Sequence, residues 1–184
     1  MVVSDEASNF KLARNFITQQ PESKHVLEYR CLVHVFNLVG ASVTEDPSVK
    51  IYTDQVLDII DMISRTKPLA AAIVEAGGGR VVRPVPTRWF STCAAINSVL
   101  RIKPGLASMP DWPEFGMSRF DPLLEDSILW DALDHLKTYF DGLSKIIGIA
   151  KCYDSNLSVA FRSFLEFGHT IFRKLPLSRD FIEG

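Results

Sequence analysis

Two residue types that commonly do chemistry, cysteine and histidine, occur three positions apart at Cys31 and His34. In a helix they share one face, which suggests half of a metal site, a nucleophile with its base, or a polar pair inside a core. The surrounding residues 30–39 are largely apolar, and apolar surroundings keep a thiol protonated, which disfavours the nucleophile. A zinc site would need scattered ligands such as His135 and His169, because no second Cys/His pair occurs.

Asp5 is a second candidate for chemistry. It follows the β-branched pair Val2 and Val3, which predicts a strand, and it precedes a helical pattern. Carboxylates at the end of a strand, just before a helix, are where α/β folds place catalytic and ligand-binding groups. The alternative is a helix cap, in which the carboxylate accepts hydrogen bonds from free backbone N–H groups.

A third candidate is the pair Arg88 and Trp89. An arginine beside a tryptophan offers a phosphate contact and a stacking surface for an unstacked base. Residues 77–110 contain no Asp or Glu, and their cations are Arg80, Arg83, Arg88, Arg101 and Lys103. The following residues 111–141 are acidic and offer counter-charges to these cations. The alternative interpretation makes Trp89 a core residue at the start of a helix.

The elements that must position these residues are mostly helices. Apolar residues recur at helical spacing over residues 10–17, 31–41, 56–63, 91–100, 129–143 and from about residue 155, and a short strand is expected over 26–29. Thr53 is expected to cap the helix that carries residues 56–63. Asp121 is expected to cap the helix that carries residues 129–143. The glycines of residues 77–79 predict a flexible connector, because no phosphate-binding pattern surrounds them.

Composition limits the class of protein. The 184 residues are 47% hydrophobic with 23% charged, which is typical of one globular domain. A net charge of −2 gives no overall attraction to nucleic acid or to an anionic membrane. No apolar run is long enough to span a bilayer, and no secretory signal is recognised. The three distant cysteines favour reduced thiols and an intracellular protein.

Three segments in order, residues 3–9, 30–39 and 86–91, resemble the hAT (hobo/Activator/Tam) DNA transposases and their domesticated derivatives. The resemblance implies an α/β, mostly helical fold. An incomplete ribonuclease-H-like core would occupy residues 1–103, and the start of an all-α insertion residues 104–184. It also implies a nuclear protein.

The resemblance assigns roles to the candidate residues. Asp5 matches the family's second catalytic acid, and Cys31 and His34 match a Cys-x-x-His helix that organises the active site without binding metal. Arg88 and Trp89 match an Arg-Trp motif whose tryptophan stabilises a flipped base. The neighbouring Arg80 and Arg83 would add phosphate contacts.

The family's first acid would lie upstream of Met1 and its last glutamate beyond Gly184. One acid cannot hold two divalent ions, so no enzyme activity and no cofactor are expected, and Mg²⁺ would bind only a complete site. Residual DNA binding by a truncated transposase-derived protein is the expected function. The alternatives are self-association or a protein partner, through residues 122–175, and a nuclease in which Glu75 or Asp111 replaces the lost acids. No membrane partner is expected.

Overall fold

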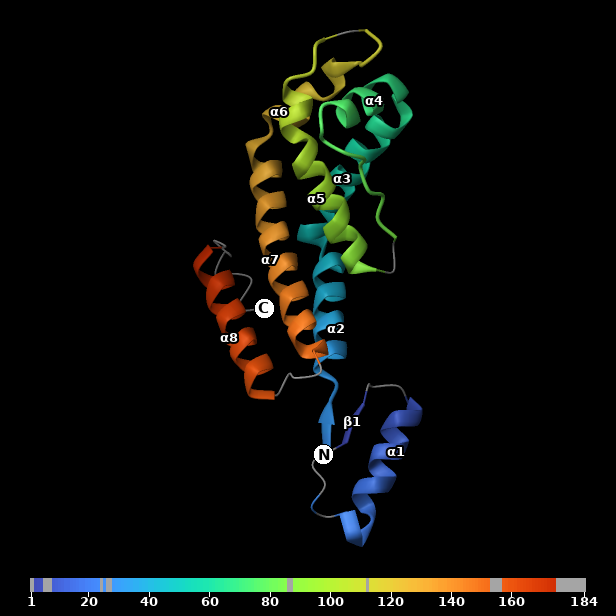
Figure 1. The fold of residues 1–184 in the computed structure, drawn as a ribbon, viewed down its shortest axis with the longest axis vertical. Coiled ribbons are helices and arrows are strands. Elements are labelled where there is room, and N and C mark those ends of the chain that lie inside the picture. The colour runs from blue at the N-terminus through green and yellow to red at the C-terminus, as the bar shows by residue number, and fades with distance from the viewer. Residues whose placement is uncertain are drawn as a thin grey trace.

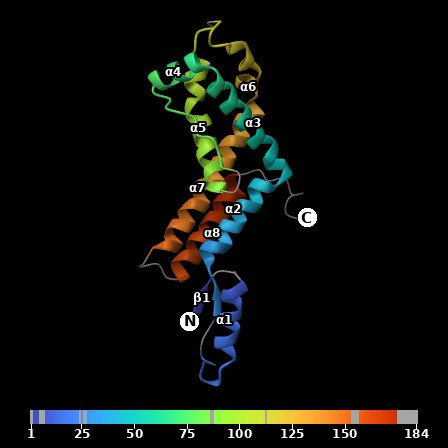
Figure 2. The same ribbon diagram turned by 90° about the vertical axis from the view of Figure 1, so that its right-hand side faces the viewer.

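The computed structural model describes residues 2–4, 8–23, 25, 28–85, 88–111, 113–152 and 157–174. The molecule is elongated, with α1 at one end and α4 and α6 at the other (Figures 1 and 2). Its elements are β1 (Val2–Ser4), α1 (Ser8–Gln19), β2 (Glu28–Arg30), α2 (Leu32–Glu45), α3 (Pro47–Arg65), α4 (Lys67–Glu75), α5 (Trp89–Ala107), α6 (Asp121–Glu125), α7 (Ser127–Lys151) and α8 (Leu157–Lys174). Two short 3₁₀ helices, Pro21–Ser23 and Met117–Arg119, precede β2 and α6.

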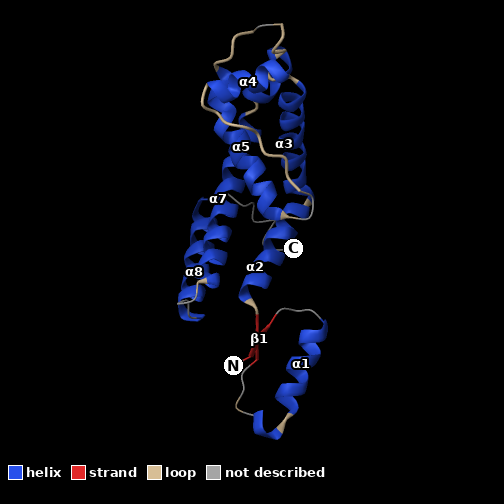
Figure 3. Cartoon of the chain, turned by 45° about the vertical axis from the view of Figure 1, so that its right-hand side comes forward, coloured by secondary structure: helices blue, strands red, loops and turns tan. Residues whose placement is uncertain are grey.

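The expected α/β, ribonuclease-H-like fold class is wrong for this structure. Across the described residues, the only sheet is a parallel pair of three-residue strands, in which Val2 lies opposite Glu28 and Ser4 opposite Arg30. Figure 3 shows these strands at the narrow junction between α1 and α2. Two strands of this length cannot form a layer over a core, so packed helices take that role.

Helix caps explain where two helices begin. The Asp46 carboxylate accepts a hydrogen bond from the Ser48 backbone N–H at 2.8 Å, and Pro47 fills the first turn of α3. The prediction that Thr53 caps this helix is wrong, because Thr53 lies inside α3, where its hydroxyl donates to the Lys50 carbonyl. The Asp126 carboxylate accepts from the Leu129 N–H and begins α7, so the cap lies five positions after Asp121, the cap expected from the sequence.

The main core lies where α5 crosses α2, α3 and α7. Its largest fully buried side chains come from α3 to α7 and their connections: Ile59, Ile60, Ile63, Leu69, Ile73, Ile96, Ile102, Leu106, Phe120, Leu129, Leu133 and Phe140. The expected division between residues 103 and 104 falls inside α5, and the core continues across it through Ile102 and Leu106. No described helix is long and apolar enough to cross a membrane.

Helix α8 lies on the outside of α7 (Figures 1 and 3). Phe167 packs where Gly142 leaves room, since a Cβ at Gly142 would come within 2.5 Å of the Phe167 ring. Phe164 reaches α2, with its ring centroid 5.7 Å from that of Phe36. Small and aromatic residues thus fix α8 against two helices.

Candidate functional site

The segment of residues 78–85, which carries Arg80 and Arg83, is held by side chains of α5. Gly77 and Gly79 have φ of 82° and 71°, which side-chain-bearing residues rarely adopt, and they turn the chain out of α4. The Arg101 guanidinium donates to the Gly78 carbonyl at 2.7 Å and to the Arg80 carbonyl at 3.0 Å. The expected flexible connector is therefore anchored, and Arg101, a cation of the acid-free segment 77–110, is occupied in anchoring it.

Two serines fix the rest of this segment. Ser98, which is buried, accepts a hydrogen bond from the Val82 N–H at 3.0 Å. Ser91 accepts from the Val85 N–H at 2.7 Å, and its hydroxyl lies within 2.6 Å of the Arg88 carbonyl. These contacts set the start of α5 and hence the place of Trp89.

Trp89 is a core residue in this structure. Its side chain is 6% exposed, and its indole Nε1 donates to the Asn37 Oδ1 at 3.2 Å. Its ring stacks with Phe90 at 3.7 Å and with Phe140 at 5.6 Å between centroids. The indole has no free face for a base here, so the stacking role would require it to leave the core.

The arginines predicted to bind nucleic acid differ in their surroundings. Arg83 forms an ion pair with Asp61 of α3, and both side chains lie near the surface. Arg80 and Arg88 are exposed. Lys103 lies over the ring of Trp130, with Nζ 4.4 Å from the centroid. Intramolecular contacts therefore occupy part of the predicted basic surface.

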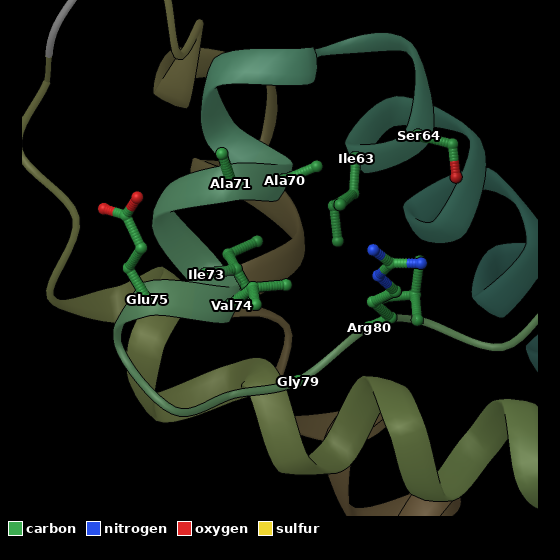
Figure 4. Close-up of a pocket in the computed structure, with 10 residues that line it drawn as sticks. Ile63, Ser64, Ala70, Ala71, Ile73, Val74, Glu75, Gly79 and Arg80 are labelled. Atoms are coloured by element: carbon green, nitrogen blue, oxygen red, sulfur yellow. The ribbon is translucent and has the colours of Figure 1, made fainter.

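Arg80 lines a cavity of about 490 Å³ between the end of α3, α4 and residues 79–81. In Figure 4 its guanidinium points toward Ile63 and Ser64 across the opening. The floor is apolar, with Ile73 and Val74, and Glu75 lies at the edge with its carboxylate pointing away from Arg80. The cavity thus combines an apolar floor with the Arg80 guanidinium.

A second cavity, of about 500 Å³, lies beside Trp89 and Arg83. Its charged lining residues are Lys50, Arg83, Glu45 and Asp54. A cavity with charges of both signs has no preference for phosphate, because the acids repel the same group that the bases attract.

Cys31 and His34 lie at the start of α2, and both are partly buried. Cys31 is the residue before the first turn, and its side chain makes no capping hydrogen bond. Within the described parts of the chain, no three His, Cys, Asp or Glu side chains gather closely enough to hold a metal ion. Asp5, the predicted catalytic acid, lies outside the described residues.

A polar cluster between α5 and α7 was not predicted. Cys93 Sγ lies 4.0 Å from Asp141 Oδ1 and accepts from Asn97 Nδ2 at 3.5 Å, and Asp141 also pairs with Lys137. Burial and the Asp141 charge raise the pKa of the Cys93 thiol, whereas the hydrogen bond to Asp141 raises the pKa of Lys137. The thiol therefore stays protonated and is a poor nucleophile.

No sequence signal joined Cys93 to Asp141, because the two residues are 48 positions apart and neither lies in a recognisable motif. No protein-family model, curated protein or solved structure matches the chain. The residues and their geometry are therefore the basis for a functional proposal.

Proposed function

We propose that this chain is a non-catalytic helical module that binds a second copy of itself through exposed apolar helix faces. The observation that supports the proposal is the number of large apolar side chains in solvent on α1 and α8. Those on α1 are Phe10, Leu12 and Phe16, at 47%, 69% and 68% exposure, and those on α8 are Val159, Phe161, Phe164 and Leu165, at 44% to 59%. Exposed apolar side chains that share one helix face, such as Leu12 with Phe16 and Phe161 with Leu165, are typical of an interaction site.

The packing of the interior also favours self-association over nucleic-acid binding. The positions at which a nucleic-acid role was expected are in large part used for packing: Trp89 is buried, and Arg83 has an ion pair with Asp61. On α1 and α8, by contrast, Leu12, Phe16, Phe161 and Leu165 are 56% to 69% exposed. Burying such side chains in an interface is favourable by about 25 cal/mol for each Å² removed from water.

Light scattering over a range of protein concentrations tests the proposal. The expected result is a mass that rises from 20.6 kDa toward twice that value as concentration increases. High salt should preserve the association, because apolar contacts are not screened by ions. A mass of 20.6 kDa at every concentration would contradict self-association.

Nucleic-acid binding is the second candidate, supported by the exposed Arg80 and Arg88 within the acid-free segment 77–110. The expected result is a salt-dependent affinity that falls in the variant Arg80→Ala/Arg88→Ala. Arg65→Ala is the matched control, because Arg65 is 80% exposed on α3, outside this segment. Equal affinity of all three proteins for single-stranded, hairpin and duplex DNA would argue against the proposed site.

Derivation from a hAT transposase is part of the proposal and rests on the order of the three sequence segments, not on the fold. Only one of the family's three acids, Asp5, has a match in the chain. We therefore expect no Mg²⁺-dependent nicking of DNA, and nicking that is lost in Asp5→Asn would overturn this expectation.

A further inference from the structure

Helix α8 presents an apolar stripe to solvent. Phe161 and Leu165 lie one turn apart on one face, and they are 59% and 56% exposed. Phe164, 44% exposed, lies between this stripe and the interior, where its ring contacts Phe36. The stripe is therefore continuous with the packed surface of the molecule.

The inner side of α8 is already packed against the rest of the molecule. Ala160 is 3% exposed, and Phe167 packs against Tyr139 and over Gly142. The apolar arc of α8 is thus wider than the surface that α7 and α2 offer to it. Its outer edge, with Phe161 and Leu165, stays in water. A partner on this edge would not have to displace any contact of the inner side.

The charges beside the stripe indicate which partner fits. Arg162 Nε lies 3.1 Å from Glu166 Oε1, one turn along the helix, and the two side chains are 83% and 66% exposed. One base and one acid separated by one turn form a pattern complementary to itself when a second helix runs antiparallel. Arg162 of each copy then lies opposite Glu166 of the other.

We propose that α8 pairs with α8 of a second copy, antiparallel, about a twofold axis near Ser163 and Phe164. Phe161 of one copy contacts Leu165 of the other, and two Arg162–Glu166 pairs flank this apolar contact. The inference rests on the proposed self-association and assigns it to one helix and one register.

Charge exchange tests the register. Arg162→Glu places acids opposite acids, and Glu166→Arg places bases opposite bases, so each variant alone should dimerise about tenfold more weakly than the parent chain. An equimolar mixture of the two variants restores both opposite-charge pairs, and the double variant R162E/E166R restores them within one protein. Both should regain the parent dimer mass in sedimentation-velocity experiments at low salt.

Controls separate this inference from the proposed function. Arg65→Glu, a charge reversal at a side chain of α3 that is 80% exposed, should leave the dimer unchanged, and circular dichroism should show the same helix content in all variants. A parent dimer that the α8 variants do not weaken, or a mixture that stays as weak as each variant, would overturn the α8 assignment while self-association stands. A parent chain that is monomeric throughout would overturn both.

Discussion

Gly40 of α2 and Trp89 of α5 depend on each other. A Cβ at Gly40 would come within 2.6 Å of the Trp89 indole, which is buried and stacked against Phe90 and Phe140. Overpacking of this kind costs about 1–3 kcal/mol. We therefore expect Gly40→Ala to lower the free energy of urea unfolding by about that amount.

Gly148→Ala is the matched control for this effect. Gly148 also lies within a helix, but nothing lies within 4 Å of a Cβ built there. Alanine is favoured over glycine inside helices by about 0.5–1 kcal/mol, so Gly148→Ala should stabilise the chain. Equal effects of the two substitutions would show that Trp89 does not pack against Gly40.

The cysteines should differ in reactivity. Burial and the nearby Asp141 raise the pKa of Cys93, and Cys93 is 8% exposed, whereas Cys152 is exposed. Because the thiolate is the reactive species, iodoacetamide at neutral pH should modify Cys152 first and Cys93 only after denaturant is added. Mass spectrometry of digested protein locates the label, and early modification of Cys93 would contradict the cluster with Asp141.

Residue types and spacing predicted what Trp89 and Arg83 could do, but not what they do in this fold. Trp89 finds Asn37, 52 positions earlier, and Arg83 finds Asp61, 22 positions earlier. Both partners lie outside the local sequence, so a functional and a structural interpretation remained equally consistent with the pattern. Only the packing of α2 and α3 on α5 distinguishes them.

Helix ends depend on short contacts, and α7 offers a test. The Asp126 carboxylate caps α7 through the Leu129 N–H at 3.0 Å, whereas Asp121 is the first residue of the short helix α6. Loss of an N-cap costs about 1 kcal/mol. Asp126→Ala should therefore destabilise the chain by about that amount in urea unfolding, and Asp121→Ala by clearly less. If Asp121→Ala destabilised the chain more than Asp126→Ala, Asp121 would be the cap, as the sequence predicted.

The cap of α3 should make stability depend on pH. The Ser48 hydroxyl, followed by the Ser48 backbone N–H, lowers the pKa of Asp46 in the folded chain. A lowered folded pKa stabilises the chain above the unfolded pKa of about 3.9, and this stabilisation is lost as pH falls through the folded pKa.

Asp46→Asn keeps an acceptor for the Ser48 N–H but cannot ionise. Its unfolding free energy should therefore fall less than that of the parent between about pH 5 and pH 2. Ser48→Ala, which removes the largest cause of the shift, should also reduce this fall. Identical pH profiles in all three proteins would contradict an ionised cap at Asp46.

At the scale of elements, periodicity located the helices better than their ends. The apolar stripe of residues 56–63 placed α3, but the sequence did not show that Asp46 rather than Thr53 begins it, because both residue types are good caps. Pro68 lies in the first turn of α4, directly after the break between α3 and α4. Pro104, by contrast, is accommodated inside α5, where tertiary packing outweighs local preference.

At the scale of the molecule, the clearest separation lies near residue 31, not at the predicted boundary between residues 103 and 104. The strand pair β1–β2 with α1 forms a small unit whose main contacts are internal, and it joins the helical body where β2 leads into α2 (Figure 1). Sequence patterns could not show this, because it depends on which helices share the core.

This N-terminal unit, residues 2–30, should unfold before the body. Two three-residue strands are marginally stable at best, and Leu12 and Phe16 of α1 are 69% and 68% exposed. Trp89 and Trp130 lie in the body at 6% and 3% exposure. They are the two tryptophans that remain in a Trp112→Phe variant, so the fluorescence of that variant reports unfolding of the body alone. We therefore expect part of the helical circular dichroism to be lost at lower denaturant than the fluorescence transition.

A chain that begins at residue 31 provides the control for this order of unfolding. It lacks the N-terminal unit, so its early loss of circular dichroism should disappear while its fluorescence midpoint stays close to that of the parent. Coincident transitions in the parent would mean that α1 packs on the body more firmly than its exposed side chains indicate. A lowered fluorescence midpoint in the shortened chain would show that β2 supports α2, and with it the Asn37 and Gly40 contacts that hold Trp89.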